Sequence, residues 1–198
     1  MSELTASQLE TLAAVAAEAV RAATTADRCW VPDPCAYEPS LRGPAAVFVT
    51  LRHLGRLARR GQLRGCVGTL TPEAPLVVAI ADRARAAAFD DPRFDAIQPD
   101  ELDDLAISVS VLSPLEPLAV DSYDELLRAL RPGIDGIVID AGRHRATFLP
   151  SVWEEIPTPE RFLDALWRKA SLPARAWPPE TRVSRYTASH SREVPVLN

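Results

Sequence analysis

The sequence has little lysine, little cysteine and no long apolar run. Lys169 is the one lysine, so nearly all of the 22 basic side chains in these 198 residues are arginines, and alanine is abundant. A bias of this kind across a whole chain is typical of a GC-rich genome, and we expect a bacterial source. It says nothing about any single site.

The cysteines, at positions 29, 35 and 66, are too few and odd in number to form a disulfide framework. Cys29 and Cys35 have no histidine pair nearby, so they do not match a structural zinc site, and we expect no metal. No run of about 18 apolar residues is present, which predicts no membrane span. The first residues lack a basic start and an apolar core, so we expect no signal peptide and a cytoplasmic protein.

The charge balance points away from a dedicated nucleic-acid binder. The chain carries 27 acidic and 22 basic side chains, a net charge of −5, whereas such binders usually present a basic face. One stretch is locally basic, from Arg52 through Arg56, Arg59 and Arg60 to Arg64. It could contact phosphate or nucleic acid locally, and a solvated loop is the alternative.

The order of apolar patterns predicts an α+β fold with mostly antiparallel strands, because helices and strands alternate without a repeating βαβ register. Ser7 and Glu10 form a predicted capping box for the first helix, and residues 24–44 form a proline-rich connection. The remaining predicted helices begin at Pro75, Ser122 and Thr158. The predicted strands are 45–51, 63–70, 105–111, 137–139, 145–149 and 183–187.

The least ordinary segment is Leu63-Arg64-Gly65-Cys66-Val67-Gly68. Glycine weakens a strand, so Gly65 and Gly68 mark a bulge or a close approach, and they would leave the backbone beside Cys66 open to a ligand. Arg64 would supply a cation that favours the thiolate, which is the reactive form of cysteine. The alternative is that Cys66 is a small buried apolar side chain.

This hexapeptide resembles the LRGCIG hallmark of the AMMECR-domain family, with valine in place of isoleucine. Further blocks resemble the same family in the same order: 47–51, the Asp-Asp-Pro-Arg-Phe segment at 90–94 with its preceding helix, 107–113, 133–137, 146–150 and 162–170. The resemblance covers about residues 41–190, and residues 1–40 lie outside it.

The resemblance implies a single AMMECR-type domain over residues 1–198 with two unequal lobes. The larger lobe would be built from both chain ends, the smaller from the middle, with the hexapeptide at a cleft between them. It also implies membership in the AmmeMemoRadiSam set, with Memo-like and radical-SAM-like proteins as partners. It implies no particular reaction or cofactor.

Other side chains are candidates near this site. His144, before the 146–150 block, could pair with Cys66 as a catalytic base, although a solvated turn histidine is the alternative, as it is for His53. Asp91 and Arg93 could contact a substrate, or could only terminate a helix and pair locally.

Together these features predict an enzyme or enzyme component that uses Cys66, with Arg64 and Arg93 holding an anionic or macromolecular substrate. The alternative is a non-catalytic adaptor that presents the same pocket to a protein or RNA. We also expect residues 63–69 and 145–150 to form neighbouring strands or strand ends, and Phe162 and Trp167 to be buried.

Overall fold

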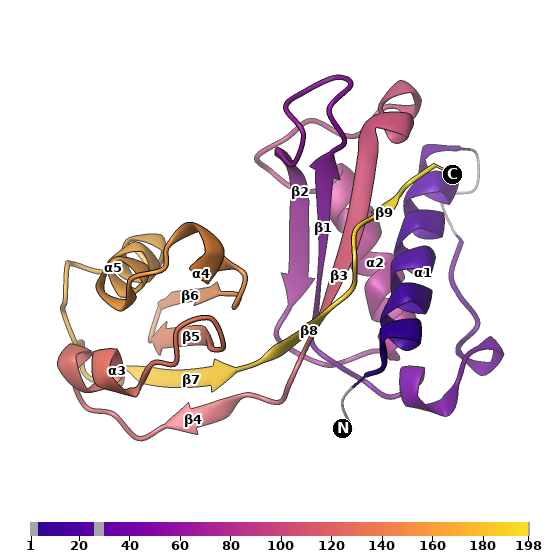
Figure 1. Cartoon of the computed structure of the whole chain (residues 1–198). Helices are drawn as coiled ribbons and strands as arrows, with labels where there is room; N and C mark the ends of the chain where they lie inside the picture. The colour runs from indigo at the N-terminus through magenta and orange to yellow at the C-terminus, as the bar shows by residue number, and fades with distance from the viewer. Residues whose placement is uncertain (1–3, 26–29, 198) are drawn as a thin grey trace. The chain divides into compact units, whose positions relative to one another are not determined.

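The computed structural model describes residues 4–25 and 30–197, and Cys29 lies outside them. The chain divides into two compact units. Unit 1 comprises Met1–Leu112 with Ser189–Asn198, and unit 2 comprises Ser113–Ala188. Both combine helices with antiparallel strands (Figure 1), so the expected α+β class is confirmed. No helix in the described ranges is long and apolar enough to cross a membrane.

Unit 1 is built on a sheet in the order β2-β1-β3-β8, with β9 also paired to β3. The central strand β1 runs antiparallel to both neighbours, and β2 pairs with β1 alone among the described strands, so β2 is an edge. The strands of this sheet are β1 (Val47–His53), β2 (Leu63–Thr69), β3 (Leu105–Leu112), β8 (Ala188–His190) and β9 (Val194–Pro195).

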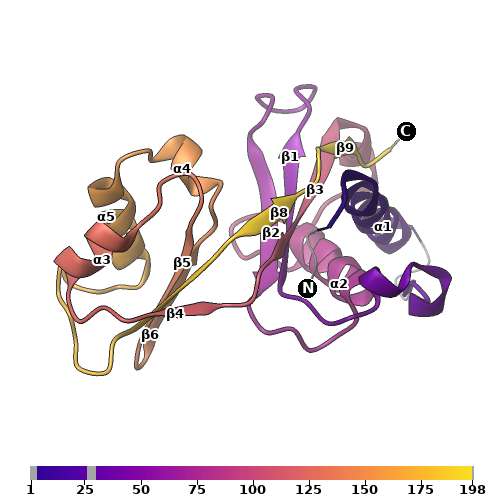
Figure 2. The same cartoon turned by 60° about the horizontal axis from the view of Figure 1, so that its bottom comes forward.

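Two helices, α1 (Ala6–Thr24) and α2 (Leu76–Phe89), cover one face of this sheet (Figures 1 and 2). Alternate residues of β1 are buried, as expected for a strand with one face against the helices. The first helix begins earlier than predicted. Thr5 and Gln8 form its capping box in place of Ser7 and Glu10. The Thr5 hydroxyl accepts from the Gln8 backbone N–H, and the Gln8 side-chain carbonyl accepts from the Thr5 backbone N–H.

The connections of unit 1 contain short 3₁₀ turns. The predicted proline-rich connection holds η1 (Pro34–Ala36) and η2 (Pro39–Leu41), each of which begins with a proline in its first turn. A third turn, η3 (Pro99–Asp104), precedes β3.

Unit 2 contains a four-stranded sheet in the order β4-β7-β5-β6, with all three pairings antiparallel. The strands β5 and β6 form a hairpin, and its turn carries Gly142 at a φ of 69°, a left-handed conformation that glycine adopts without strain. The elements of this unit are β4 (Glu116–Leu118), α3 (Tyr123–Ala129), β5 (Gly136–Ala141), β6 (His144–Phe148), α4 (Val152–Glu155), α5 (Pro159–Lys169) and β7 (Arg182–Tyr186).

Aromatic side chains fill the core of unit 2. The rings of Trp153 and Phe162 stack with centroids 3.8 Å apart, and Tyr123 meets Trp167 edge to face at 5.2 Å. Phe162 and Trp167 are both buried, as the apolar face of α5 predicts. Residues 63–69 and 145–150 were expected to form neighbouring strands or strand ends; β2 and β6 belong to different sheets, so they are not paired strands.

Candidate functional site

Cys66 lies in the middle of the edge strand β2, opposite Thr50 of β1, and Thr50 in turn lies opposite Ser108 of β3. Directly opposed residues point to the same side of a sheet, so these three small polar side chains form one row across it. The row faces away from α1 and α2, because Val49 and Leu51 fill the helix-covered side. The Cys66 thiol is half-buried, and its Sγ accepts a hydrogen bond from the Thr50 hydroxyl at 3.4 Å.

The two glycines of the hexapeptide are required by packing. A Cβ atom on Gly65 would lie 2.1 Å from the carbonyl oxygen of Ala87 in α2, so glycine lets the helix approach the strand closely. A Cβ atom on Gly68 would lie 2.2 Å from the Phe48 ring, which covers this position from the neighbouring strand. Their Cβ directions therefore face the protein itself, and the glycines shape the strand around Cys66.

The edge of β2 at Cys66 is closed by Asp91 and Arg93, which follow the end of α2. The Cys66 N–H donates to Asp91 Oδ2 at 2.9 Å, and the Cys66 carbonyl accepts from Arg93 Nη2 at 3.3 Å. The pair thus supplies one acceptor and one donor, as a neighbouring strand would. The unpaired backbone groups of an edge strand can pair with another chain. Here Asp91 and Arg93 occupy both backbone groups of Cys66, so these groups are not free to pair in that way.

The side chains of Asp91 and Arg93 also bind each other with two hydrogen bonds, Nε to Oδ1 at 2.9 Å and Nη2 to Oδ2 at 2.7 Å. The hydrogen bonds from the Arg93 side chain hold the pKa of the buried Asp91 carboxyl well below its usual range, and burial opposes this only in part. Asp91 is therefore a carboxylate at neutral pH, and its position makes it a positioning residue for the Cys66 peptide.

Arg64 points to a different partner. Its guanidinium forms a two-bond ion pair with Glu101 of η3, with Nε to Oε2 at 2.9 Å and Nη2 to Oε1 at 3.1 Å. The arginine that contacts the Cys66 peptide is thus Arg93, 27 residues away along the chain, whereas the sequence had suggested the adjacent Arg64. The remaining nitrogen of Arg64, Nη1, is buried and has no hydrogen-bond partner among the described residues.

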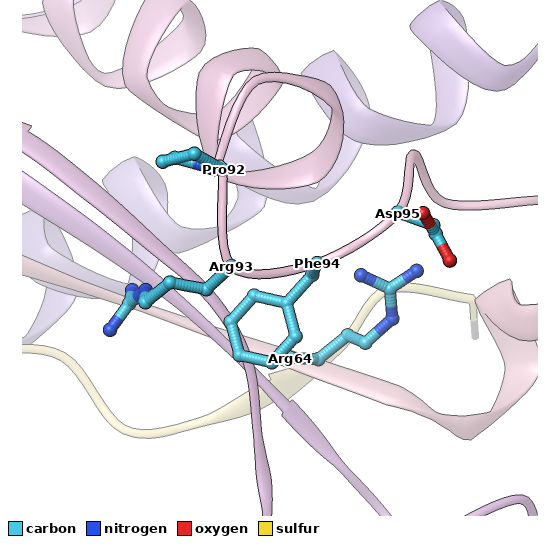
Figure 3. Close-up of a pocket in the computed structure, with 5 residues that line it drawn as sticks. All are labelled: Arg64, Pro92, Arg93, Phe94 and Asp95. Atoms are coloured by element: carbon cyan, nitrogen blue, oxygen red, sulfur yellow. The ribbon is translucent and has the colours of Figure 1, made fainter.

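A recess of about 420 Å³ opens beside this network, lined by Arg64, Pro92, Arg93, Phe94 and Asp95 (Figure 3). The Phe94 ring lies between the two arginine side chains, with its centroid 5.9 Å from the Cζ of Arg64 and 5.4 Å from that of Arg93. Phe94 therefore forms part of the recess.

The charges at the recess nearly cancel. Arg64 is paired with Glu101 and Arg93 with Asp91, while Asp95 is exposed and has no such partner among the described residues. The sequence suggested that the two arginines hold an anion. In the structure each of these guanidinium groups is already hydrogen-bonded to a carboxylate.

A second buried network fixes the connection between β1 and β2. The Asp104 carboxylate accepts from the backbone N–H groups of Arg56 and Leu57, and its Oδ2 lies 2.9 Å from Nδ1 of His53. Burial alone would raise the pKa of Asp104, yet these hydrogen bonds lower it to about 2. Sequence patterns did not reveal this network, in which His53 is buried and paired and does not lie in a solvated turn.

His144, the other predicted catalytic residue, lies in unit 2 at the start of β6. Its Nδ1 is 2.9 Å from the Ala170 carbonyl oxygen, and its Nε2 is 3.4 Å from Nε of Arg143. Both ring nitrogens thus have local partners in the structure. Within residues 4–25 and 30–197 no group of three or more histidine, cysteine, aspartate or glutamate side chains could hold a metal ion.

The sequence of this chain is similar to those of known proteins. A family model described as AMMECR1 matches residues 13–191. The chain belongs to the AMMECR1 family. Relatives include a protein of Methanothermobacter thermautotrophicus, 42% identical over 148 residues that cover 72% of each chain. Another, from Thermotoga maritima, is 37% identical over 157 residues, which cover 79% of this chain and 82% of the relative.

A solved structure of this family shares the fold. The crystal structure of the uncharacterized protein PH0010 from Pyrococcus horikoshii matches with a TM-score of 0.86 and 30% sequence identity, and the match covers 96% of this chain and 97% of that one. None of these three relatives has a name that states a reaction.

Proposed function

We propose that this AMMECR1 protein is a cytoplasmic enzyme, or a component of one, in which Cys66 acts as a nucleophile or redox thiol. The substrate would approach from the recess, in contact with Arg64 and Arg93. The observation that carries the proposal is a half-buried thiol on a strand whose peptide group is fixed by Asp91 and Arg93. A fixed, reachable nucleophile is what covalent catalysis requires.

Two neighbours place hydrogen-bond donors on Cys66. The Thr50 hydroxyl donates to the sulfur, and such a bond would stabilise negative charge that develops there during a reaction. The Arg93 guanidinium donates to the carbonyl of the same residue and brings a positive charge beside it.

The second candidate function is a non-catalytic adaptor. It is favoured by the partner of the sulfur, which is a hydroxyl group, whereas a nucleophilic cysteine is commonly activated by a base. In that case the segment would present a shaped surface to another macromolecule, and the thiol would be a packing group. The two candidates differ in one measurable property, the reactivity of the thiol in the folded protein.

Alkylation of the folded protein tests this difference. In a background where Cys29 and Cys35 are serine, iodoacetamide should label Cys66 at neutral pH faster than it labels a free model thiol, whose pKa is about 8.5. Arg93→Ala should slow the labelling several-fold, because the nearby cation is lost. Thr50→Val should slow it as well, because the donor to the sulfur is lost.

The control is Arg161→Ala, which removes an exposed arginine from α5 in unit 2 and should leave the rate unchanged. Circular dichroism of each variant would establish that the fold is retained. If Cys66 reacts only when the protein unfolds, the nucleophile proposal fails and the adaptor function is favoured.

A further inference from the structure

The bonds from Asp91 and Arg93 to the outer edge of β2 cover Cys66 and leave Gly68 uncovered. In an antiparallel pair, successive residues turn their backbone N–H and C=O groups alternately toward the partner strand and away from it. The groups of Cys66 bond Asp91 and Arg93, so they point away from β1. The register is regular from Cys66 to Gly68, two residues along, so the N–H and C=O groups of Gly68 point to the same outer edge.

Both of these outward groups of Gly68 lack a hydrogen-bond partner in the described part of the chain. Gly68 is also half-buried rather than buried, and since glycine has no side chain, all of its exposed surface is main chain. A donor and an acceptor that are both unpaired on one edge residue form the pattern that a sheet edge offers to another extended chain.

The sheet face beside Gly68 adds an apolar surface. Phe48 lies opposite Gly68 in β1, and its ring fills the space that a side chain at position 68 would take. The ring is half-buried, and it lies on the side of the sheet that also carries Cys66. Directly opposed residues point to one side of a sheet. A residue that paired with Gly68 from outside would therefore place its side chain next to the Phe48 ring.

We infer that the β2 edge at Gly68 binds an extended polypeptide segment, one residue of which bonds both groups of Gly68 and rests an apolar side chain on Phe48. The inference rests on the proposed function, since it names the substrate class that would reach Cys66, two residues away on the same edge. The pair of Asp91 and Arg93 limits the register, because it already occupies the next outward position. In this mode of recognition, main-chain bonds supply affinity and alternate side chains supply selectivity.

Simpler ligands satisfy only one of the two groups. An anion would accept from the Gly68 N–H and leave the carbonyl without a donor, whereas a cation would do the reverse. One residue of an extended chain presents an N–H and a C=O together on one side. A second copy of the protein could supply such a chain through its own β2 edge, so self-association is an outcome of the test.

The binding test is an NMR titration of the Cys66→Ser protein labelled with nitrogen-15, so that thiol chemistry does not contribute. The probe is the pentapeptide Thr-Thr-Val-Thr-Thr with blocked ends, whose single valine determines which residue lies opposite Gly68. We expect a saturable shift of the Gly68 amide resonance. The amide of Gly142, in the hairpin turn of unit 2, should not shift.

Two N-methylated forms of the probe, identical in composition, test the main-chain pairing. Methylation of the valine nitrogen removes the donor to the Gly68 carbonyl and should raise the Kd about tenfold. Methylation of the fourth residue changes a nitrogen that points away from β2, because N–H directions alternate along an extended chain. That form should bind within about twofold of the unmethylated probe, since it keeps both bonds to Gly68.

A variant of the protein tests the apolar contact. Phe48→Leu keeps an apolar side chain and removes the ring, and it should raise the Kd about threefold, as expected for the loss of a cross-strand aromatic contact. The matched control is Phe89→Leu, which removes a half-buried ring from the end of α2 and should leave the Kd unchanged.

Several results would overturn the inference. Equal affinities of the two N-methylated probes would show that the main chain does not pair with the edge. A Gly68 amide that does not shift would show that the peptide does not bind at this position. A Gly68 shift that depends on protein concentration without any peptide would identify a second copy of the chain as the occupant. Because binding is measured without the thiol, an unreactive Cys66 would contradict the proposed enzyme and leave this peptide site standing.

Discussion

The cores of the two units differ in the size of their side chains. Unit 1 packs α1 and α2 through many alanines, and α2 approaches β2 so closely that the Ala87 carbonyl occupies the space of a Gly65 side chain. Unit 2 packs stacked aromatic rings between α5 and its sheet. Small residues allow backbones to come close, whereas large rings hold them apart and fill the gap.

The difference explains why the candidate site is in unit 1. Asp91 and Arg93 follow directly after α2, so the contact between Ala87 and Gly65 sets how near they come to β2. A side chain at position 65 would push the end of the helix outward and separate Asp91 from the Cys66 N–H. The sequence of small residues thus positions the charged pair that fixes the thiol.

Unit 2 also protects an edge strand, but with simpler means. The Lys169 ammonium group, at the end of α5, donates to the Thr147 carbonyl on the edge strand β6 at 2.9 Å and lies 5.1 Å from the Phe148 ring centroid. Lysine is a common way to protect a sheet edge. Both edges are thus closed by side chains from a following helix or its end, and the edge in unit 1 is the one that carries a thiol.

The largest expected effect comes from removing volume in unit 2. Trp167 is buried, meets Tyr123 edge to face and donates from Nε1 to the Ala176 carbonyl at 2.7 Å. Trp167→Ala leaves a cavity in a core of rings, and the free energy of unfolding should fall by about 3–5 kcal/mol. Urea unfolding followed by circular dichroism would measure it.

The control for this variant is Leu57→Ala, because Leu57 is 61% exposed and its loss should cost less than about 0.5 kcal/mol. A Trp167→Ala protein that unfolds at the same urea concentration as the wild type would show that the aromatic core does not support unit 2.

Unit 1, in contrast, should be destabilised when volume is added to its core. Gly65→Ala places a methyl group 2.1 Å from a helix carbonyl that cannot rotate away, so the free energy of unfolding should fall by about 2–3 kcal/mol. Gly43→Ala is the matched control, because nothing lies within 4 Å of its Cβ position. If the Gly65→Ala protein is as stable as the wild type and the Gly43→Ala control, then α2 does not lie as close to β2 as described.

The sequence predicted the elements of this fold better than its contacts. The periodic apolar pattern from Pro75 to Phe89 gave the second helix, and the strand predicted at 105–111 is β3. The α+β class and the AMMECR1 family are both confirmed. These features depend on residues that are neighbours in the chain, which is why local patterns reveal them.

The partners of the charged residues could not be predicted in the same way. Arg64 pairs with Glu101 and the Cys66 peptide with Asp91, across 37 and 25 residues. Which carboxylate meets which donor depends on the packing of α2 and η3, and several acidic residues in 90–104 compete for the same arginines. β3 is also buried at nearly all positions, including Ala106 and Ser110 on the side that alternates with its large apolar residues.

The smallest expected effect concerns the buried carboxylate of unit 1. Because the pKa of Asp104 is about 2 in the folded protein, below the ordinary value of about 3.9, the carboxylate stabilises the fold fully above that ordinary value. This stabilisation is lost as the pH falls through the folded pKa.

Asp104→Asn lacks it at every pH and also offers an amide to the donors on Arg56 and Leu57. Its melting temperature should therefore lie below that of the wild type at pH 5, and the gap should narrow between pH 4 and pH 2. Differential scanning calorimetry over this range measures the gap, with the exposed Asp121→Asn as the control that shows none. A gap that stays constant from pH 5 to pH 2 would mean that the Asp104 carboxylate is not what holds the connection between β1 and β2.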